Sequence, residues 1–207
     1  MQFNPLTYAL LSQEVYTAKP QIGDERSSAR AIIESTIDGT AFAFPGTDNI
    51  ACWLADLDCG VVRTELGRVH NGFNTAANLI RTEIEAKVST VPKPIILTGH
   101  SEGAALALLL GGYLSASGHA CKAIFAFEPP RVTADNVLGD LLKQHGVYVY
   151  ATEHGQDIVP MVPRLLFPWQ HPVPLTPIGT PTLPFPNVTD HEMARVVDAV
   201  RAMVLPA

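Results

Sequence analysis

A serine with glycine at both second neighbours, in the stretch Gly-His-Ser-Glu-Gly at positions 99–103, is the residue of this sequence best placed to do chemistry. The stretch joins an apolar run with the look of a buried strand to an apolar run that suits a buried helix. A serine on so tight a turn has a strained backbone and an exposed hydroxyl, and the two glycines relieve the crowding. The pattern therefore predicts a nucleophile elbow with Ser101 as the nucleophile. The alternative is an ordinary glycine-rich turn with an N-cap serine.

A serine hydroxyl is a weak nucleophile at neutral pH, so the chain must also supply a base and a group that orients it. In folds with such an elbow, an acid and then a histidine follow the serine along the chain. Asp157 comes soon after a predicted strand, and His191 lies at the start of the last predicted helix, so we expect these two. His154 fits less well as the base because it lies three residues before Asp157. Asp190 fits less well as the acid because it adjoins His191.

An oxyanion hole is the remaining requirement of such a site. One donor is expected to be the backbone N–H of Glu102, the residue after the nucleophile. The loop in AFAFPGTDN, at 41–49, follows an early predicted strand, and Gly46 lets the chain turn there. We expect the N–H of Thr47 to be the second donor, and a simple turn is the alternative. His100, on the elbow itself, is expected to point away from the hydroxyl and to pack or hydrogen-bond elsewhere.

The elements that must position these residues can be read from the hydrophobic periodicity. Helices are predicted after the cap Asn4-Pro5, over 73–88, over 104–114, after 133 and from 193 onward, and strands over 30–36, 40–44, 95–97, 123–127 and 147–150. Residues 189–192 have the spacing of a capping box for the last helix. The alternation of strands and helices predicts an α/β fold, with a mostly parallel sheet covered by helices and one domain over 1–207. Residues 160–186 hold nine of the 17 prolines and are expected to form a long surface loop.

Composition excludes several classes of protein. The chain of 207 residues is 47% hydrophobic and 16% charged with a net charge of −6, and it contains no run of Lys or Arg, so no nucleic-acid partner is expected. The three cysteines lack the spacing of a zinc site or a disulfide framework, and neither a metal nor a cofactor is expected. The N-terminal residues do not have the pattern of a signal peptide, which predicts a cytoplasmic protein or export by a non-classical route. No apolar run is long enough to span a bilayer.

Four motifs in order resemble those of the class 3 lipase family, the α/β-hydrolases typified by secreted fungal triacylglycerol lipases. They are FAFPGTDNIACWLADLD at 42–58, VHNGF at 69–73, ILTGHSEGAALALLLGGYL at 96–114 and DIVPMVP at 157–163. The resemblance implies an α/β-hydrolase fold with a mixed sheet, no metal, and hydrolysis of carboxylic esters such as acylglycerols. It implies Ser101 as nucleophile, His191 as base, Asp157 as its partner, Thr47 and Glu102 as the oxyanion hole, and a lid at 48–57.

The sequence departs from the family pattern at three positions of these motifs. Pro45 stands in place of the usual arginine, Glu102 in place of leucine and Ala104 in place of glycine. The carboxylate of Glu102 close to the reaction site affects the expected choice of substrate more than the class of reaction.

Apolar side chains around the expected lid and the proline-rich loop suggest an acyl-binding wall and a possible action at a lipid–water interface. Those expected to bind substrate are Trp53, Leu54, Phe167 and Trp169. They fit equally well as packing residues of an esterase for short acyl chains. The alternatives that keep the same three catalytic residues are a thioesterase, a phospholipase and a polymer-ester depolymerase. A non-catalytic binding module of the same fold is the alternative from another class.

Overall fold

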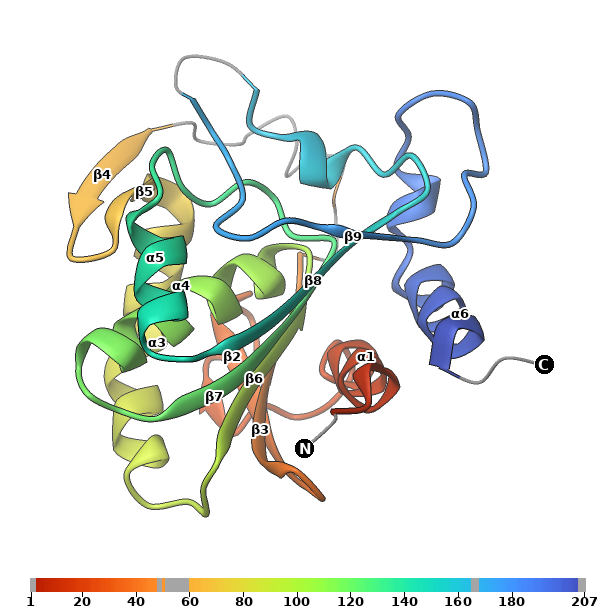
Figure 1. The fold of residues 1–207 in the computed structure, drawn as a ribbon. Coiled ribbons are helices and arrows are strands. Elements are labelled where there is room, and N and C mark those ends of the chain that lie inside the picture. The colour runs from red at the N-terminus through yellow and green to blue at the C-terminus, as the bar shows by residue number, and fades with distance from the viewer. Residues whose placement is uncertain (1–2, 48–49, 51–59, 165–167, 205–207) are drawn as a thin grey trace.

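A central sheet of seven strands organises the computed structural model, which describes residues 3–47, 50, 60–164 and 168–204 (Figure 1). The strands, in sheet order, are β1 (Ile22–Gly23), β2 (Arg30–Thr36), β3 (Gly39–Phe44), β6 (Ile95–His100), β7 (Cys121–Phe127), β8 (Tyr148–His154) and β9 (Thr176–Ile178). Strand β2 is antiparallel to β1 and β3, and the pairs from β3 to β9 are all parallel. The predicted mixed, mostly parallel sheet is therefore confirmed.

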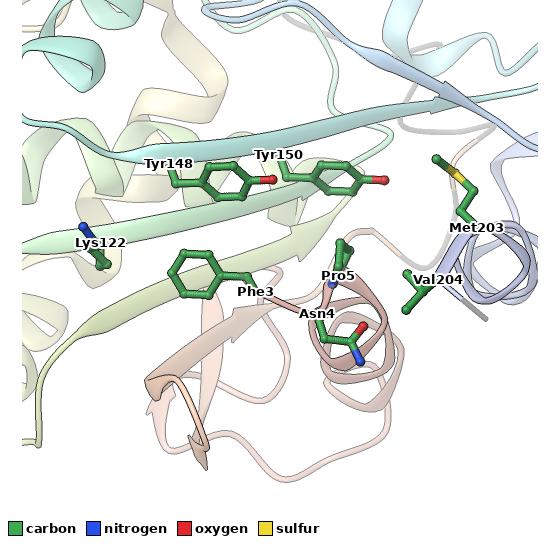
Figure 2. A pocket seen from close by; sticks show the side chains of 8 residues that line it. All are labelled: Phe3, Asn4, Pro5, Lys122, Tyr148, Tyr150, Met203 and Val204. Carbon is green, nitrogen blue, oxygen red and sulfur yellow. The ribbon is translucent and has the colours of Figure 1, made fainter. Parts of the chain in front are cut away.

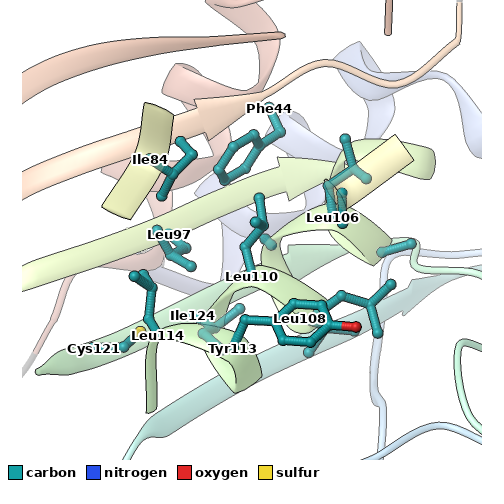
Figure 3. Packing of buried hydrophobic residues seen from close by; sticks show 14 of the residues in the cluster. Phe44, Ile84, Leu97, Leu106, Leu108, Leu110, Tyr113, Leu114, Cys121 and Ile124 are labelled. Atoms are coloured by element: carbon teal, nitrogen blue, oxygen red, sulfur yellow. The ribbon is translucent and has the colours of Figure 1, made fainter. Parts of the chain in front are cut away.

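Helices cover both faces of this sheet (Figure 1). Helices α3 (Asn71–Val88), α4 (Glu102–Ala116) and α5 (Val137–Gln144) lie on one face, and α1 (Pro5–Glu14) and α6 (Met193–Val204) lie on the other. The α4 residues from 102 to 115 are all buried, because α4 packs on the sheet and is covered by α3 and α5 (Figure 3). This position explains why its sequence is apolar on every side. No described helix is long and apolar enough to cross a membrane.

A second, two-stranded sheet of β4 (Val61–Thr64) and β5 (Gly67–His70) precedes α3 and was not predicted from the sequence. Its strands are four residues each and carry Arg63 and Arg68, so they lack the alternating apolar pattern that marks a half-buried strand. The hairpin ends at His70, whose Nδ1 accepts a hydrogen bond from the Phe73 N–H at 3.4 Å and caps α3.

The proline-rich segment 160–186 contains more regular structure than expected. A 3₁₀ turn, η1 (Val159–Met161), overlaps its start, and strand β9 pairs with β8 at the edge of the sheet. Pro177 lies inside β9, where an edge strand tolerates a residue without an N–H donor.

The chain reaches α6 through a 3₁₀ turn, η2 (Thr189–His191), rather than through the predicted capping box. Glu192 is extended, with φ −62° and ψ 121°, and its carbonyl accepts hydrogen bonds from the N–H groups of Arg195 and Val196. The capping-box prediction is therefore wrong, because α6 begins at Met193. His191 lies in η2 before the helix and not in its first turn.

Asp190 joins η2 to the segments packed beside it. Its carboxylate accepts hydrogen bonds from the Gln156 N–H at 2.8 Å, from the Thr182 hydroxyl at 2.6 Å and from the Asn187 amide at 3.1 Å. Burial alone would raise the pKa of Asp190, but these hydrogen bonds outweigh it and lower the pKa to about 2. The charged carboxylate therefore holds three separate stretches of chain together.

We expect Asp190→Asn to lower the free energy of unfolding at pH 7 by about 2 kcal/mol, or the melting temperature by about 4–8 °C, because the amide turns a donor toward groups that themselves donate. The folded-state pKa of Asp190 lies below that of the unfolded chain, so this stabilisation is present above about pH 4 and is lost as the pH falls toward 2. Thermal unfolding at pH 7 and pH 3 measures it. Asp198→Asn is the control, since that exposed carboxylate forms an ion pair with Arg201 within α6. A difference between wild type and Asp190→Asn that does not shrink at pH 3 would contradict the prediction.

Candidate active site

The elbow predicted around Ser101 lies between β6 and α4. Ser101 has φ 58° and ψ −126°, a conformation that is strained for any residue except glycine. A Cβ atom added to Gly99 would lie 2.3 Å from the backbone of Gly103, and one added to Gly103 would lie 2.1 Å from the carbonyl oxygen of Phe44. Both glycines are therefore required by the close approach of the backbones, as the sequence pattern predicted.

The backbone and side chain of Ser101 have different environments. Its N–H donates a hydrogen bond of 2.9 Å to the carbonyl of Phe127, at the end of the neighbouring strand β7. Its hydroxyl oxygen is buried and has no hydrogen-bond partner among the described residues. Helix α4 begins at Glu102, so the first N–H groups of the helix and its positive end lie beside this hydroxyl. The arrangement favours negative charge on an oxygen near Ser101.

Asp157 and His191, which are 34 residues apart, meet in the interior. His191 Nδ1 and Asp157 Oδ2 are 2.6 Å apart, and the side chains are 6% and 0% exposed. The other carboxylate oxygen of Asp157 accepts the N–H of Val159 at 2.9 Å. With Nδ1 bonded to the carboxylate, His191 Nε2 is the nitrogen able to accept a proton. That atom is buried and unpaired within the described part of the chain.

His100, on the elbow, packs against His191. The centroids of the two imidazole rings are 4.4 Å apart, and His100 Nδ1 is hydrogen-bonded to the Tyr16 hydroxyl at 2.7 Å. Burial, and then the neighbouring His191, lower the pKa of His100 well below its ordinary value. His100 is therefore neutral at neutral pH, and it packs against the imidazole of His191.

Thr47 follows Gly46 in the loop that crosses the elbow. A Cβ atom on Gly46 would lie 2.8 Å from the Cβ of Ser101, so this loop runs directly against the serine. A cavity of about 430 Å³ opens here. Its lining is formed by Gln13, Tyr16, Thr17, Thr47, Ile50, His100, Val188, His191, Glu192 and Met193. Thr47 and His191 therefore border one cavity beside Ser101.

Glu102 carries a carboxyl group that is nearly buried, and one of its oxygens accepts a hydrogen bond from the Ser28 hydroxyl at 3.1 Å. Burial raises the pKa of Glu102, and the hydrogen bond from Ser28 offsets part of that shift. The backbone N–H of Glu102 and the carboxyl group thus lie in the same region, next to the serine.

Of the four residues predicted to bind substrate, only Trp169 lies among the described residues. Trp169 is 6% exposed, with its ring centroid 5.2 Å from that of His70, and it is not among the described residues that line the 430 Å³ cavity. Trp53, Leu54 and Phe167 lie outside the described residues, as does the predicted lid at 48–57 except for Ile50. The apolar lining instead includes Tyr16, Val188 and Met193, which sequence reasoning missed because they come from both ends of the chain.

Glu128 is a further buried acid that sequence reasoning missed. It directly follows β7, as Ser101 directly follows β6, and its carboxyl group faces that of Asp157. The signal was present in the sequence, since an acidic residue right after a buried strand lies at the edge of a parallel sheet where sites form.

A larger cavity, of about 800 Å³, has none of these groups in its lining (Figure 2). Lys122 and Tyr148, at the starts of β7 and β8, line it together with the first residues of α1 and the end of α6. Sites in parallel sheets form at the carboxyl ends of the strands, so this cavity is at the wrong end for the chemistry. Nowhere in the described ranges do three or more His, Cys, Asp or Glu residues cluster as a metal site would require.

Known proteins share the sequence pattern and the fold. The secreted mono- and diacylglycerol lipase 1 of Fusarium solani is 29% identical over 137 residues, covering 62% of this chain and 40% of that protein. The secreted mono- and diacylglycerol lipase A of Penicillium cyclopium is 28% identical over 152 residues, covering 69% and 48%. The chain thus spans less than half the length of these relatives.

The structure of the Lip2 lipase from Yarrowia lipolytica superposes with a TM-score of 0.67 at 20% identity, covering 84% of this chain and 77% of that one. The predicted α/β-hydrolase fold is confirmed by this likeness. The sequence model of the family described as lipase (class 3) matches residues 41–167, which is more than half of the chain. This chain belongs to the class 3 lipase family.

Proposed function

We propose that this chain is a serine hydrolase that cleaves carboxylic esters of acylglycerols, with Ser101 as nucleophile, His191 as base and Asp157 as the partner of the base. The observation that carries the proposal is the buried 2.6 Å contact between His191 Nδ1 and Asp157 Oδ2, beside a serine held on a strained elbow. Burying an imidazole–carboxylate pair is costly, and such pairs occur at functional sites. Here His191 Nε2 and the Ser101 hydroxyl are both buried and have no partner among the described residues.

The chemistry is acyl transfer. The Ser101 oxygen attacks the ester carbonyl carbon while its proton passes to His191 Nε2, and Asp157 holds the imidazole tautomer and stabilises the imidazolium. The backbone N–H groups of Thr47 and Glu102 take the negative oxygen of the tetrahedral intermediate. Collapse of the intermediate releases the alcohol, which takes its proton from His191, and water then frees the acid from the acyl-enzyme.

The 430 Å³ cavity supports an acyl chain as the group that is bound. Its apolar walls, with Ile50, Val188 and Met193 among them, converge on His191 and Thr47. Acylglycerols are supported as substrates by two relatives whose descriptions name them mono- and diacylglycerol lipases. Those descriptions also call the relatives secreted, which supports export of this chain. Rates on butyrate esters compared with long-chain mono-, di- and triacylglycerol emulsions would separate a lipase from an esterase for short chains.

Ser101→Ala is expected to reduce hydrolysis of p-nitrophenyl butyrate by at least about 10⁴-fold, because no other group supplies the attacking oxygen. It should also abolish covalent labelling by a fluorophosphonate probe. Initial rates and in-gel labelling measure the two effects.

The matched control is Ser115→Ala, on the same helix. The Ser115 hydroxyl is buried and donates to the Gly111 carbonyl, so this variant loses a buried hydroxyl without touching the elbow. Labelling of wild type that persists in Ser101→Ala, or a wild type that takes no label, would reject the assignment and favour a binding module.

Asp157→Asn is expected to lower kcat by about 10⁴-fold with little change in KM, because the amide donates to Nδ1 and so selects the wrong imidazole tautomer. Steady-state kinetics on the same ester measure it. Asp135→Asn serves as the control, since Asp135 also accepts backbone and Arg68 hydrogen bonds but lies in another part of the fold. A loss of less than tenfold in Asp157→Asn would exclude Asp157 as the partner of the base.

A further inference from the structure

Glu128 lies at the sheet edge that carries the proposed catalytic residues. It is the first residue after β7, between the ends of β6 and β8 that lead to Ser101 and Asp157. Its side chain is 0% exposed. A glutamate is almost never fully buried unless it is paired, so its presence here needs a reason.

The backbone of Glu128 is strained as well. Its φ is 52°, and among the described non-glycine residues only Ser101 shares a positive φ. Glycine would relieve that strain, so a residue with a long acidic side chain is kept here at a cost in backbone energy. The two strained residues are linked, because the Ser101 N–H donates to the carbonyl of Phe127, the residue just before Glu128.

The Glu128 carboxyl group is bonded to the chain that leads into Asp157. One oxygen accepts the Thr152 hydroxyl at 2.9 Å, and the other accepts the His154 N–H at 2.5 Å. The Asp157 N–H in turn donates to the His154 carbonyl at 3.0 Å, which closes a turn over 154–157. The Glu128 carboxyl group also faces the Asp157 carboxyl group closely enough for a hydrogen bond between them.

Two carboxyl groups that share a hydrogen bond must share a proton. Asp157 already accepts from His191 and from the Val159 N–H, which fits the charged member of the pair. No ion pair between described residues involves Glu128, so only the hydrogen bonds from Thr152 and His154 would offset a charge there. Burial and the neighbouring Asp157 raise the pKa of Glu128 well above its ordinary value. The proton therefore belongs to Glu128.

We propose that Glu128 is a positioning residue of this site: as an uncharged carboxylic acid it donates a hydrogen bond to Asp157 and fixes the carboxylate that orients His191. The inference rests on the proposed function, since Glu128 acts through Asp157 and does not touch the substrate. Its O–H group supplies Asp157 with a donor besides the imidazole of His191 and the Val159 N–H, so the carboxylate cannot rotate without breaking that bond.

Loss of the Glu128 proton would place two carboxylates in contact in the interior and would disturb the 154–157 turn. The titratable groups that interact with Glu128 are Asp157, Tyr150 and, through its backbone N–H, His154, and His191 contacts Asp157 in turn. None of these is a lysine or arginine that would favour the charged form. Activity of the wild type is therefore expected to fall at alkaline pH as Glu128 ionises.

The test compares Glu128→Gln, which keeps an N–H donor toward Asp157 and an acceptor, with Glu128→Leu, which keeps neither. We expect kcat of Glu128→Gln at pH 7 to stay within about threefold of wild type and kcat of Glu128→Leu to fall at least tenfold at similar KM. The alkaline loss of kcat/KM in wild type should be weaker or shifted to higher pH in Glu128→Gln. Glu153→Gln is the matched control, because it makes the same change at an exposed position of β8.

A second experiment measures the melting temperature and does not depend on enzymatic activity. The folded-state pKa of Glu128 is raised, so its contribution to stability is full below the unfolded pKa, about 4.3, and is lost as the pH rises. From pH 5 to pH 9 the melting temperature of wild type should therefore fall relative to that of Glu128→Gln. It should not fall relative to that of Glu153→Gln.

The outcomes separate the two proposals. If the wild type hydrolyses no ester and takes no fluorophosphonate label, the proposed function is rejected. The melting temperatures still test whether Glu128 is uncharged in the folded protein. Parallel melting curves of wild type and Glu128→Gln across pH, or a Glu128→Gln variant that folds but is as inactive as Glu128→Leu, would overturn the role of Glu128. If Glu128→Leu does not fold, the pH profile and the melting temperatures of Glu128→Gln decide the question.

Discussion

The contact between His191 Nδ1 and Asp157 Oδ2 is the interaction on which the rest of the site depends. Both side chains are almost completely buried, so each would carry a large desolvation cost without the other. The contact also fixes which ring nitrogen remains available, and so it determines what His191 can do chemically. The strands and turns around the site position His191, Asp157 and Ser101 relative to one another.

The parallel strands of the central sheet position most of these residues. The carboxyl ends of β6, β7 and β8 lie side by side, so Ser101, Glu128 and the turn to Asp157 gather at one edge although they are far apart in sequence. The Ser101 N–H bonded to the Phe127 carbonyl fixes the elbow to the next strand, and the Glu128 N–H bonded to the Thr152 carbonyl fixes that strand to the following one. The spacing between nucleophile and acid is thus set by backbone hydrogen bonds as well as by side chains.

The sequence predicted those parts of the structure that depend on local patterns. Glycine at 99 and 103 indicated the elbow, because a Cβ atom at either position would lie only 2.3 Å or 2.1 Å from neighbouring backbone atoms. The meeting of Asp157 with His191 was predicted from their order along the chain and from their places beside a predicted strand and a predicted helix. The packing of Tyr16 on His100 could not, because these residues are 84 positions apart and no local pattern marks their contact. The short strands β4 and β5 were missed because their charged residues hide the alternation.

Two further acids flank the 154–157 turn, and their opposite protonation states follow from the donors each one meets. Asp190 receives hydrogen bonds from Gln156, Thr182 and Asn187, which together outweigh its burial and keep it charged. Glu128 receives two hydrogen bonds but faces a second carboxyl group, so burial and repulsion keep it neutral. The turn is therefore held by the charged Asp190, which accepts a hydrogen bond from Gln156, and by the neutral Glu128, which donates one to Asp157. If Glu128 were charged like Asp190, Asp157 would face a buried like charge. If Asp190 were neutral like Glu128, the N–H groups around it would have a weaker acceptor. The position of the His191 imidazole therefore depends on a charged Asp190 together with a neutral Glu128.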